Sequence, residues 1–313
     1  MNPVFLLDVD GVLKRGYDAL ECGQRALDYL NERRIPYLLV SNTTGDDEQI
    51  SAHLSHILGR SISPLNFICA STPLTDLMSK IPVQTPILAL GAPKFTRSYF
   101  NKFNLKSVFY SNELFRQFPD SCPQYKFTQT EPSESKTASY QNQEIEYLIF
   151  HSDSTDWYAD NQIALDCVMN HGQMNPQIKG NPEHKVKIIC TNPDLTYADK
   201  HILPRLTVGM QTEQVKAMYT LLTGKELEIE YHGKPYNKIF ETAKNRFTDK
   251  THTFYMIGDS LQSDIRGGNL NNCESVLVLT GKAQIGDWEQ LDKEFTPKHV
   301  YGDVFEAIKD LTK

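Results

Sequence analysis

Two apolar segments, near opposite ends of the chain, are each followed by a pair of carboxylates. The segments are residues 4–7 and 253–258, and the pairs are Asp8 with Asp10 and Asp259 with Asp264. Runs that are apolar throughout suit parallel strands covered on both faces. Because parallel sheets bind ligands outside the carboxyl ends of their strands, we expect both pairs to meet at one sheet edge.

Carboxylates that meet at one point repel each other unless a cation lies among them. Oxygen ligands without His or Cys favour a hard ion such as Mg²⁺, which keeps open positions for water and a substrate phosphate. Taken alone, Asp10-Gly11 is equally well explained as a turn after a strand. The second acidic pair favours the metal site.

Two further positions suit a phosphate group. Ser41 and Asn42 end the apolar run 36–42, and Lys234 in "HGKP" precedes a predicted helix that begins at Pro235. A hydroxyl, backbone N–H groups, a helix N-terminus and an ammonium all attract phosphate oxygens. Singly, Ser41 is explained by a turn and Lys234 by a solvated surface position. Their order at strand ends favours phosphate binding.

Short apolar runs alternate with amphipathic segments, which predicts an α/β fold with a parallel sheet. Further predicted strands are 86–91, 146–152, 186–192 and 275–280, and predicted helices are 18–34, 46–58 and 235–247. The stretch 119–144 is rich in Ser, Thr, Pro and Gln, and we expect a long surface loop there.

The spacing of the motifs places an extra domain. Asp8 and Ser41 are 33 residues apart, which leaves room for one strand-helix-strand unit only. Ser41 and Lys234 are 193 residues apart, far more than the rest of a core needs. The expected division is a core over 1–82, an inserted α/β domain over 83–206 and the remaining core over 207–313.

The charge balance and the cysteines limit the classes of function. The chain has 32 basic and 39 acidic residues, which argues against a nucleic-acid binder. No stretch approaches the roughly 18 apolar residues of a membrane span. Six scattered cysteines favour reduced thiols inside a cell and give little support to a zinc site. Without an Arg-rich leader, we expect the cytosol rather than the mitochondrion.

The ordered motifs "DVDGV", "SN", "GKP" and "GDSLQSDI" resemble those of the haloacid dehalogenase superfamily, in its class IIA (NagD and p-nitrophenylphosphatase) branch. "TNPDL" (191–195) is also similar to a class IIA feature. Four stretches resemble more closely the domain-containing-protein-5 type, the cat eye syndrome critical region 5 family: "DGVLKRG", "DWYADNQI", "NPDL" and "VYGDVFEAI". Ser41 stands where class IIA often has Thr, and Ser260 where relatives commonly have Arg or Asn.

This resemblance implies a Rossmann-like core with an inserted cap domain of the C2 type, and a phosphatase that acts on a small phosphorylated metabolite. Asp8 would form an aspartyl phosphate, and Asp10 would serve as general acid and base. The phosphoryl group would be bound by Ser41, Asn42 and Lys234, and Mg²⁺ by Asp8, the Asp10 backbone carbonyl, Asp259 and Asp264. Substrate contacts in the cap would be Asp156, Trp157, Asn192 and Asp194. A homodimer through the cap is also implied.

Several alternatives share parts of this pattern. A phosphotransferase shares the aspartyl-phosphate step, although mutases of the superfamily usually carry their cap between the first two motifs, where this chain has no room. A dehalogenase needs neither Asp10 nor a metal. A receiver domain is far shorter and has adjacent acidic residues. A binding or scaffold protein that kept the fold without turnover stays open.

Overall fold

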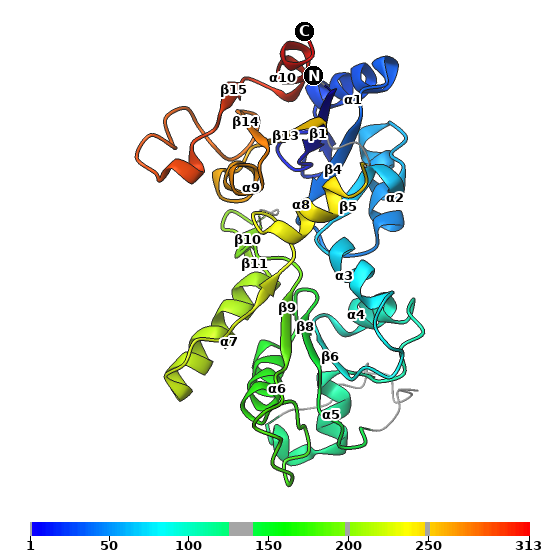
Figure 1. Cartoon of the computed structure of the whole chain (residues 1–313), viewed down its shortest axis with the longest axis vertical. Helices are drawn as coiled ribbons and strands as arrows, with labels where there is room; N and C mark the ends of the chain where they lie inside the picture. Colours follow the sequence, from blue (N-terminus) through cyan, green and yellow to red (C-terminus); the bar gives the residue numbers. More distant parts are fainter. Residues whose placement is uncertain (1, 125–139, 198–200, 248–250) are drawn as a thin grey trace. The chain divides into compact units, whose positions relative to one another are not determined.

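The computed structural model describes residues 2–124, 140–197, 201–247 and 251–313. The chain forms two compact units. Unit 1 consists of Met1–Pro73 and His232–Lys313, and unit 2 of Leu74–Tyr231. Unit 1 therefore joins the two ends of the chain, which Figure 1 shows as blue and orange-red segments that form one body.

The centre of unit 1 is a six-stranded sheet in the order β15-β14-β13-β1-β4-β5. All five strand pairs are parallel. The strands are β1 (Asn2–Leu7), β4 (Tyr37–Ser41), β5 (Phe67–Cys69), β13 (His252–Gly258), β14 (Glu274–Val278) and β15 (His299–Tyr301). The chain runs outward from β1 on one side and from β13 on the other. The strand order therefore reverses between β1 and β13, where α/β sheets bind their ligands.

Helices cover both faces of this sheet. Alternate strand residues, such as Phe5 and Leu7, pack with α1 (Glu21–Arg33), α2 (Asp47–Leu58) and α10 (Val304–Leu311). Their neighbours Val4 and Leu6 pack with α8 (Asn237–Lys244) on the other face. This explains why the strands are apolar throughout. The other elements of unit 1 are η1 (Pro64–Asn66), η3 (Leu261–Ile265), α9 (Arg266–Leu270), η4 (Lys293–Phe295) and the hairpin β2 (Lys14–Arg15) and β3 (Asp18–Ala19).

The predicted strands and helices of this unit are present, with one difference that bears on the site. The helix predicted from Pro235 begins at Asn237, and Tyr236 is its N-cap residue. Lys234 and Pro235 lie in the turn before it, where the N–H of Tyr236 donates to the carbonyl of Gly233 (3.0 Å). Lys234 is therefore held by a turn and not by the first turn of a helix.

Unit 2 has its own five-stranded parallel sheet, in the order β12-β9-β8-β6-β7. One face packs with α5, α6 and α7, and the other with α3 and α4. The strands are β6 (Ile87–Leu90), β7 (Val108–Phe109), β8 (Tyr147–Phe150), β9 (Lys187–Cys190) and β12 (Glu230–Tyr231), beside the antiparallel pair β10 (Thr196–Tyr197) and β11 (Arg205–Leu206). The helices are α3 (Thr72–Met78), which begins in unit 1, α4 (Pro93–Phe100), α5 (Ser111–Gln117), α6 (Trp157–Met169) and α7 (Val208–Thr223), with η2 (Pro119–Ser121).

Two sequence expectations for the middle region differ from the structure. The expected domain ended at residue 206, whereas Val208 and Val215 of α7 pack in the core of unit 2. Of the predicted surface loop 119–144, residues 125–139 lie outside the described residues. Beyond them, Tyr140 is buried in the core of unit 2, and its hydroxyl accepts from the N–H of Met174 (2.9 Å). The polar composition around Tyr140 predicted a surface loop, and nothing in the sequence therefore indicated that Tyr140 is buried.

Candidate active site

Three carboxylates from two motifs meet at the carboxyl edge of the sheet in unit 1. Asp8 follows β1, Asp259 follows β13, and Asp264 lies in η3. One carboxylate oxygen of each lies within 4.8 Å of the others. Asp259 and Asp264 are buried, and 13% of the Asp8 side chain is exposed. Of the two acidic pairs expected to meet at this edge, Asp8, Asp259 and Asp264 form the cluster, whereas the side chain of Asp10 does not join it.

The ammonium of Lys234 lies among these carboxylates. It donates to Oδ1 of Asp8 (2.6 Å), to Oδ1 of Asp264 (2.7 Å) and to the backbone carbonyl of Val40 (2.9 Å). All three N–H bonds of the ammonium are therefore used. Burial by itself lowers the pKa of Lys234, but Asp264 and Asp8 outweigh it and raise the pKa above the ordinary lysine value. The lysine is a fixed cation that orients Asp8.

The Lys234 ammonium bonds two of the three carboxylates, and the charges of Lys282 and Lys234 only partly offset the effects of burial and of Asp8 on Asp259. The remaining repulsion is visible in the pKa values. Burial and the charge of Asp8 raise the pKa of Asp259 to about 6 and that of Asp264 to about 7. A group whose charged form is so unfavourable accepts either a proton or a second cation.

Two glycines leave the space that the Asp259 carboxylate occupies. A Cβ atom at Gly281 would lie 1.8 Å from Oδ2 of Asp259, and one at Gly11 would lie 2.2 Å from the same oxygen. Gly11 also has φ +81°, a conformation that L side chains rarely adopt. The N–H of Lys282 donates to Oδ2 of Asp259 (2.7 Å) and fixes its orientation.

The predicted phosphate contacts lie at the same edge. The Asn42 amide accepts from the N–H of Lys234 (2.7 Å) and donates to its carbonyl (2.9 Å), so it holds the lysine backbone in place. The hydroxyl of Ser41, at the end of β4, accepts from the N–H of Thr43 (3.2 Å). Asn42 therefore has a positioning function in this structure in addition to the contact that the sequence predicts.

Asp10 lies apart from the three clustered carboxylates. Its side chain is 59% exposed and forms an ion pair with Lys14. The carbonyl of its neighbour Gly11 accepts from the hydroxyl of Thr280 (2.5 Å). Asp8 and Asp10 therefore have different surroundings.

The four cap residues predicted as substrate contacts lie in unit 2, where three of them have local structural partners. Asp156 is the N-cap of α6 and accepts from the N–H of Ala159 (3.1 Å). Asn192 accepts from the N–H of Asp194 (2.9 Å) in the loop after β9. Trp157, the first residue of α6, is half-buried. These bonds explain the polar residues structurally without excluding a substrate contact.

Sequence reasoning did not single out Lys14, Thr280, Gly281 and Lys282. The last three follow β14, whose carboxyl end lies beside that of β13. The same strand-end argument that identified Asp259 applies to "TGK" (280–282), because β14 was predicted from its apolar run. Lys14 had no such signal, since it reaches Asp10 through a short hairpin.

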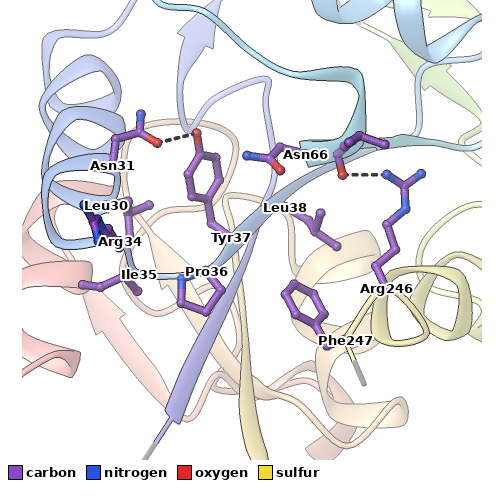
Figure 2. Close-up of a pocket in the computed structure, with 11 residues that line it drawn as sticks. Leu30, Asn31, Arg34, Ile35, Pro36, Tyr37, Leu38, Asn66, Arg246 and Phe247 are labelled. Carbon is purple, nitrogen blue, oxygen red and sulfur yellow. Dashed lines mark hydrogen bonds between the residues drawn. The ribbon is translucent and has the colours of Figure 1, made fainter. Parts of the chain in front are cut away.

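A pocket of about 670 Å³ lies in unit 1, away from the carboxylates. Figure 2 shows it at the end of α1 and the start of β4, with Arg246 and Phe247 on its far side. Tyr37, the first residue of β4, donates to Asn31 there (3.3 Å). Ser41 ends the same strand at the opposite edge of the sheet, so this pocket is not part of the acidic site.

The acidic cluster fits a divalent cation. In the described part of the chain, Asp8, Asp259 and Asp264 are the group that can hold a metal ion, and all their donor atoms are oxygens. Hard ligands of this kind select Mg²⁺ over softer ions. Burial and the charge of Asp8 raise the pKa values of Asp259 and Asp264, as expected for a site that favours a further cation.

Family models agree with this geometry. A haloacid dehalogenase-like hydrolase model matches residues 5–106, and a HAD-hydrolase-like model matches residues 231–307. Together these segments contain the whole carboxylate cluster. The chain belongs to the haloacid dehalogenase-like hydrolases. The predicted superfamily and the predicted hydrolase class are thereby confirmed.

Curated relatives of this hydrolase include proteins with mitochondrial and phosphatase names. A mitochondrial hydrolase of Saccharomyces cerevisiae is 28% identical, over 97% of this chain and 94% of the relative. A cardiolipin synthase/mitochondrial hydrolase fusion protein of Schizosaccharomyces pombe is 29% identical over 96% of this chain, which spans about half of the fusion protein. An acid sugar phosphatase of Staphylococcus epidermidis is 22% identical over 99% of this chain and 98% of the relative.

Solved structures share the fold of this hydrolase over nearly its full length. A p-nitrophenyl phosphatase from Archaeoglobus fulgidus has a TM-score of 0.72 at 17% identity and covers 99% of both chains. NagD from E. coli has a TM-score of 0.65 at 16% identity and covers 98% of both. The predicted α/β core with an inserted α/β cap is confirmed as the fold. Among the described residues, no helix is long and apolar enough to cross a membrane.

Proposed function

We propose that this hydrolase is a Mg²⁺-dependent phosphatase that cleaves a small phosphomonoester through an aspartyl phosphate on Asp8. The observation that carries the proposal is the arrangement of Asp8, held at 2.6 Å by the Lys234 ammonium, beside two further carboxylates, of which the same ammonium bonds only Asp264. Lys234 thus holds the Asp8 carboxylate, 13% of whose side chain is exposed, next to the buried Asp259 and Asp264. Phosphoryl transfer needs this kind of positioning and charge neutralisation.

In the first step, a carboxylate oxygen of Asp8 attacks phosphorus, and the bond between phosphorus and the ester oxygen breaks. Asp10 donates its proton to the departing oxygen, which leaves as an alcohol. In the second step, Asp10 accepts a proton from water, whose oxygen attacks phosphorus. The bond between phosphorus and Asp8 breaks, which releases inorganic phosphate and regenerates the free Asp8 carboxylate.

Residues of both motifs surround these reacting groups. Lys234 holds and orients Asp8, and the phosphoryl oxygens are proposed to contact Ser41, Asn42 and Lys234. When bound to Asp8, Asp259, Asp264 and the Asp10 backbone carbonyl, Mg²⁺ would neutralise charge on the transferring phosphoryl group.

The substrate class and the cell compartment are part of this proposal. Sugar phosphates are the first substrates to test, because a relative that aligns along nearly the whole chain is named an acid sugar phosphatase. The cap residues Asp156, Trp157, Asn192 and Asp194 are the proposed contacts to the alcohol part of the substrate, and a dimer through the cap is retained as an expectation. For the compartment, the names of the two fungal relatives favour the mitochondrion over the cytosol expected from the sequence.

Phosphate release from a panel of sugar phosphates and p-nitrophenyl phosphate tests the proposal. The panel is measured with Mg²⁺, with a chelator and with Asp8→Asn. Release that needs Mg²⁺ and is lost in the variant is the expected result. A protein that binds Mg²⁺ and releases phosphate from no compound would instead be a binding protein with the fold of a phosphatase.

A further inference from the structure

Lys14 has an unusual position for a lysine near the protein surface. Only 14% of its side chain is exposed, whereas 59% of its partner Asp10 is exposed. Its ammonium bonds to Oδ1 of Asp10 and donates to the carbonyl of Gly16 (3.1 Å). The Lys14 side chain therefore lies against the protein and bonds a carboxylate that is itself largely exposed.

The backbone around Lys14 is fixed to the same loop that carries Asp10. The carbonyl of Lys14 accepts from the N–H of Gly11 (2.8 Å), and its N–H donates to the carbonyl of Val9 (3.1 Å). Arg15, the next residue, donates to the carbonyl of Thr280 (2.5 Å). Strand β2 of the hairpin is thus attached to the loop after β1 and to the segment after β14.

These backbone contacts hold Lys14 and Asp10 close to each other. Lys14 lies four residues after Asp10, and a β-bridge links the two backbones. An exposed Asp side chain without such a partner rotates freely between rotamers. The ammonium therefore selects one orientation of the Asp10 carboxylate.

We propose that Lys14 is a positioning residue. It orients the Asp10 carboxylate so that Asp10 can accept a proton from the attacking water in the second step of the reaction. The inference rests on the proposed phosphatase function. During the first step, the substrate itself can hold Asp10 through a hydrogen bond to its ester oxygen. After the alcohol has left, only a water molecule faces Asp10, and the protein must supply the orientation.

In this step the base is the Asp10 carboxylate, which takes one proton from water. The water oxygen forms a bond to phosphorus, and the bond between phosphorus and the Asp8 oxygen breaks. Lys14 gains and loses no proton. Its contribution is geometric, and a misplaced catalytic group typically costs about 100-fold in rate.

Lys14→Met tests the inference, because methionine keeps most of the side-chain volume and removes the charge. With p-nitrophenyl phosphate and Mg²⁺, we expect kcat to fall about 10- to 100-fold, with KM falling by a similar factor. The ratio kcat/KM then stays within about threefold, because it reports only steps up to release of the alcohol. A burst of about one equivalent of p-nitrophenol per chain should precede the slow steady state.

Two further variants separate positioning from general effects. Lys14→Arg keeps a cation at the same place and should recover most of kcat. Lys298→Met removes a different lysine of unit 1, one that pairs with Glu274 (3.0 Å) at the surface, and should leave both constants unchanged. Thermal midpoints of all variants are compared, so that loss of folding is not counted as loss of positioning.

The outcomes distinguish this inference from the proposed function. If the parent protein turns over substrate and Lys14→Met keeps its kcat within twofold, the positioning role is wrong and the phosphatase stands. A fall in kcat/KM as large as the fall in kcat, without a burst, also overturns it, because Lys14 then acts on binding or on the first step. A parent protein without turnover contradicts the phosphatase and this inference together.

Discussion

Replacing Asp259 with Asn should make the metal-free protein more stable. Burial and the charge of Asp8 raise the pKa of Asp259 to about 6, about two units above its ordinary value of 3.8. At about 1.4 kcal/mol per unit, the ionised carboxylate costs the folded state about 3 kcal/mol near neutral pH. Asparagine has nearly the same shape and no charge, and its amide oxygen can still accept from the N–H of Lys282. The variant therefore removes the cost and keeps the contact.

The assay is thermal unfolding at pH 7.5 in a chelator, followed by a Mg²⁺ titration. A gain of about 3 kcal/mol corresponds to roughly 5–10 °C for a domain of this size. Mg²⁺ should stabilise the parent and have a much weaker effect on Asp259→Asn. Asp10→Asn is the matched control, because it also alters an active-site aspartate but one whose carboxylate is 59% exposed, and ion pairs of exposed carboxylates are worth about 0–1 kcal/mol. Equal or lower stability of metal-free Asp259→Asn would refute the charge argument.

Three further predictions concern the same cluster. Lys234→Met leaves buried carboxylates without their cation and should cost about 3–5 kcal/mol in urea unfolding; a loss under 1 kcal/mol would contradict the bonding described for it. Without metal, the folded state binds more protons than the unfolded one between about pH 4 and 7, because the pKa values of Asp259 and Asp264 are raised. Their contribution to stability should therefore increase as the pH is lowered from 8 to 5, and Asp259→Asn should reduce this gain in a pH series of melting curves. Gly281→Ala places a Cβ atom 1.8 Å from the Asp259 carboxylate. It should weaken Mg²⁺ binding at least tenfold by calorimetry, and unchanged affinity would show that the loop adapts.

The sequence predicted the carboxylate cluster because strand ends leave a strong pattern. Asp8 and Asp259 each follow a fully apolar strand, and neighbouring parallel strands bring their carboxyl ends to one edge. The sequence also located the insertion, since the distance between Ser41 and Lys234 exceeds what one core unit uses.

Other features depend on contacts that no local pattern records. Lys234 was expected at a helix N-terminus, but it reaches Asp8 and Asp264 from a turn, over gaps of 226 and 30 residues. Lys14 interacts with Asp10 because a hairpin folds the chain back, which a pattern of apolar residues cannot reveal. Tyr140 follows a polar stretch and is nevertheless buried, because tertiary packing outweighs local composition.

The assignment of α7 has the same explanation. The sequence placed residues 207–313 in the core, whereas α7 packs against α6 and β9 of unit 2. A sequence of alternating strands and helices marks the elements clearly, but it does not mark where one core ends and the next begins.

Direct detection of the aspartyl phosphate tests the central claim most closely. The protein is mixed with Mg²⁺ and a phosphomonoester that it hydrolyses, and the reaction is quenched in acid. Borohydride is then added, which reduces an acyl phosphate to an alcohol. Peptide mass spectrometry should then find the reduced side chain at Asp8, only when substrate was present. Phosphate release without modification of Asp8, or with modification of another residue, would contradict the account.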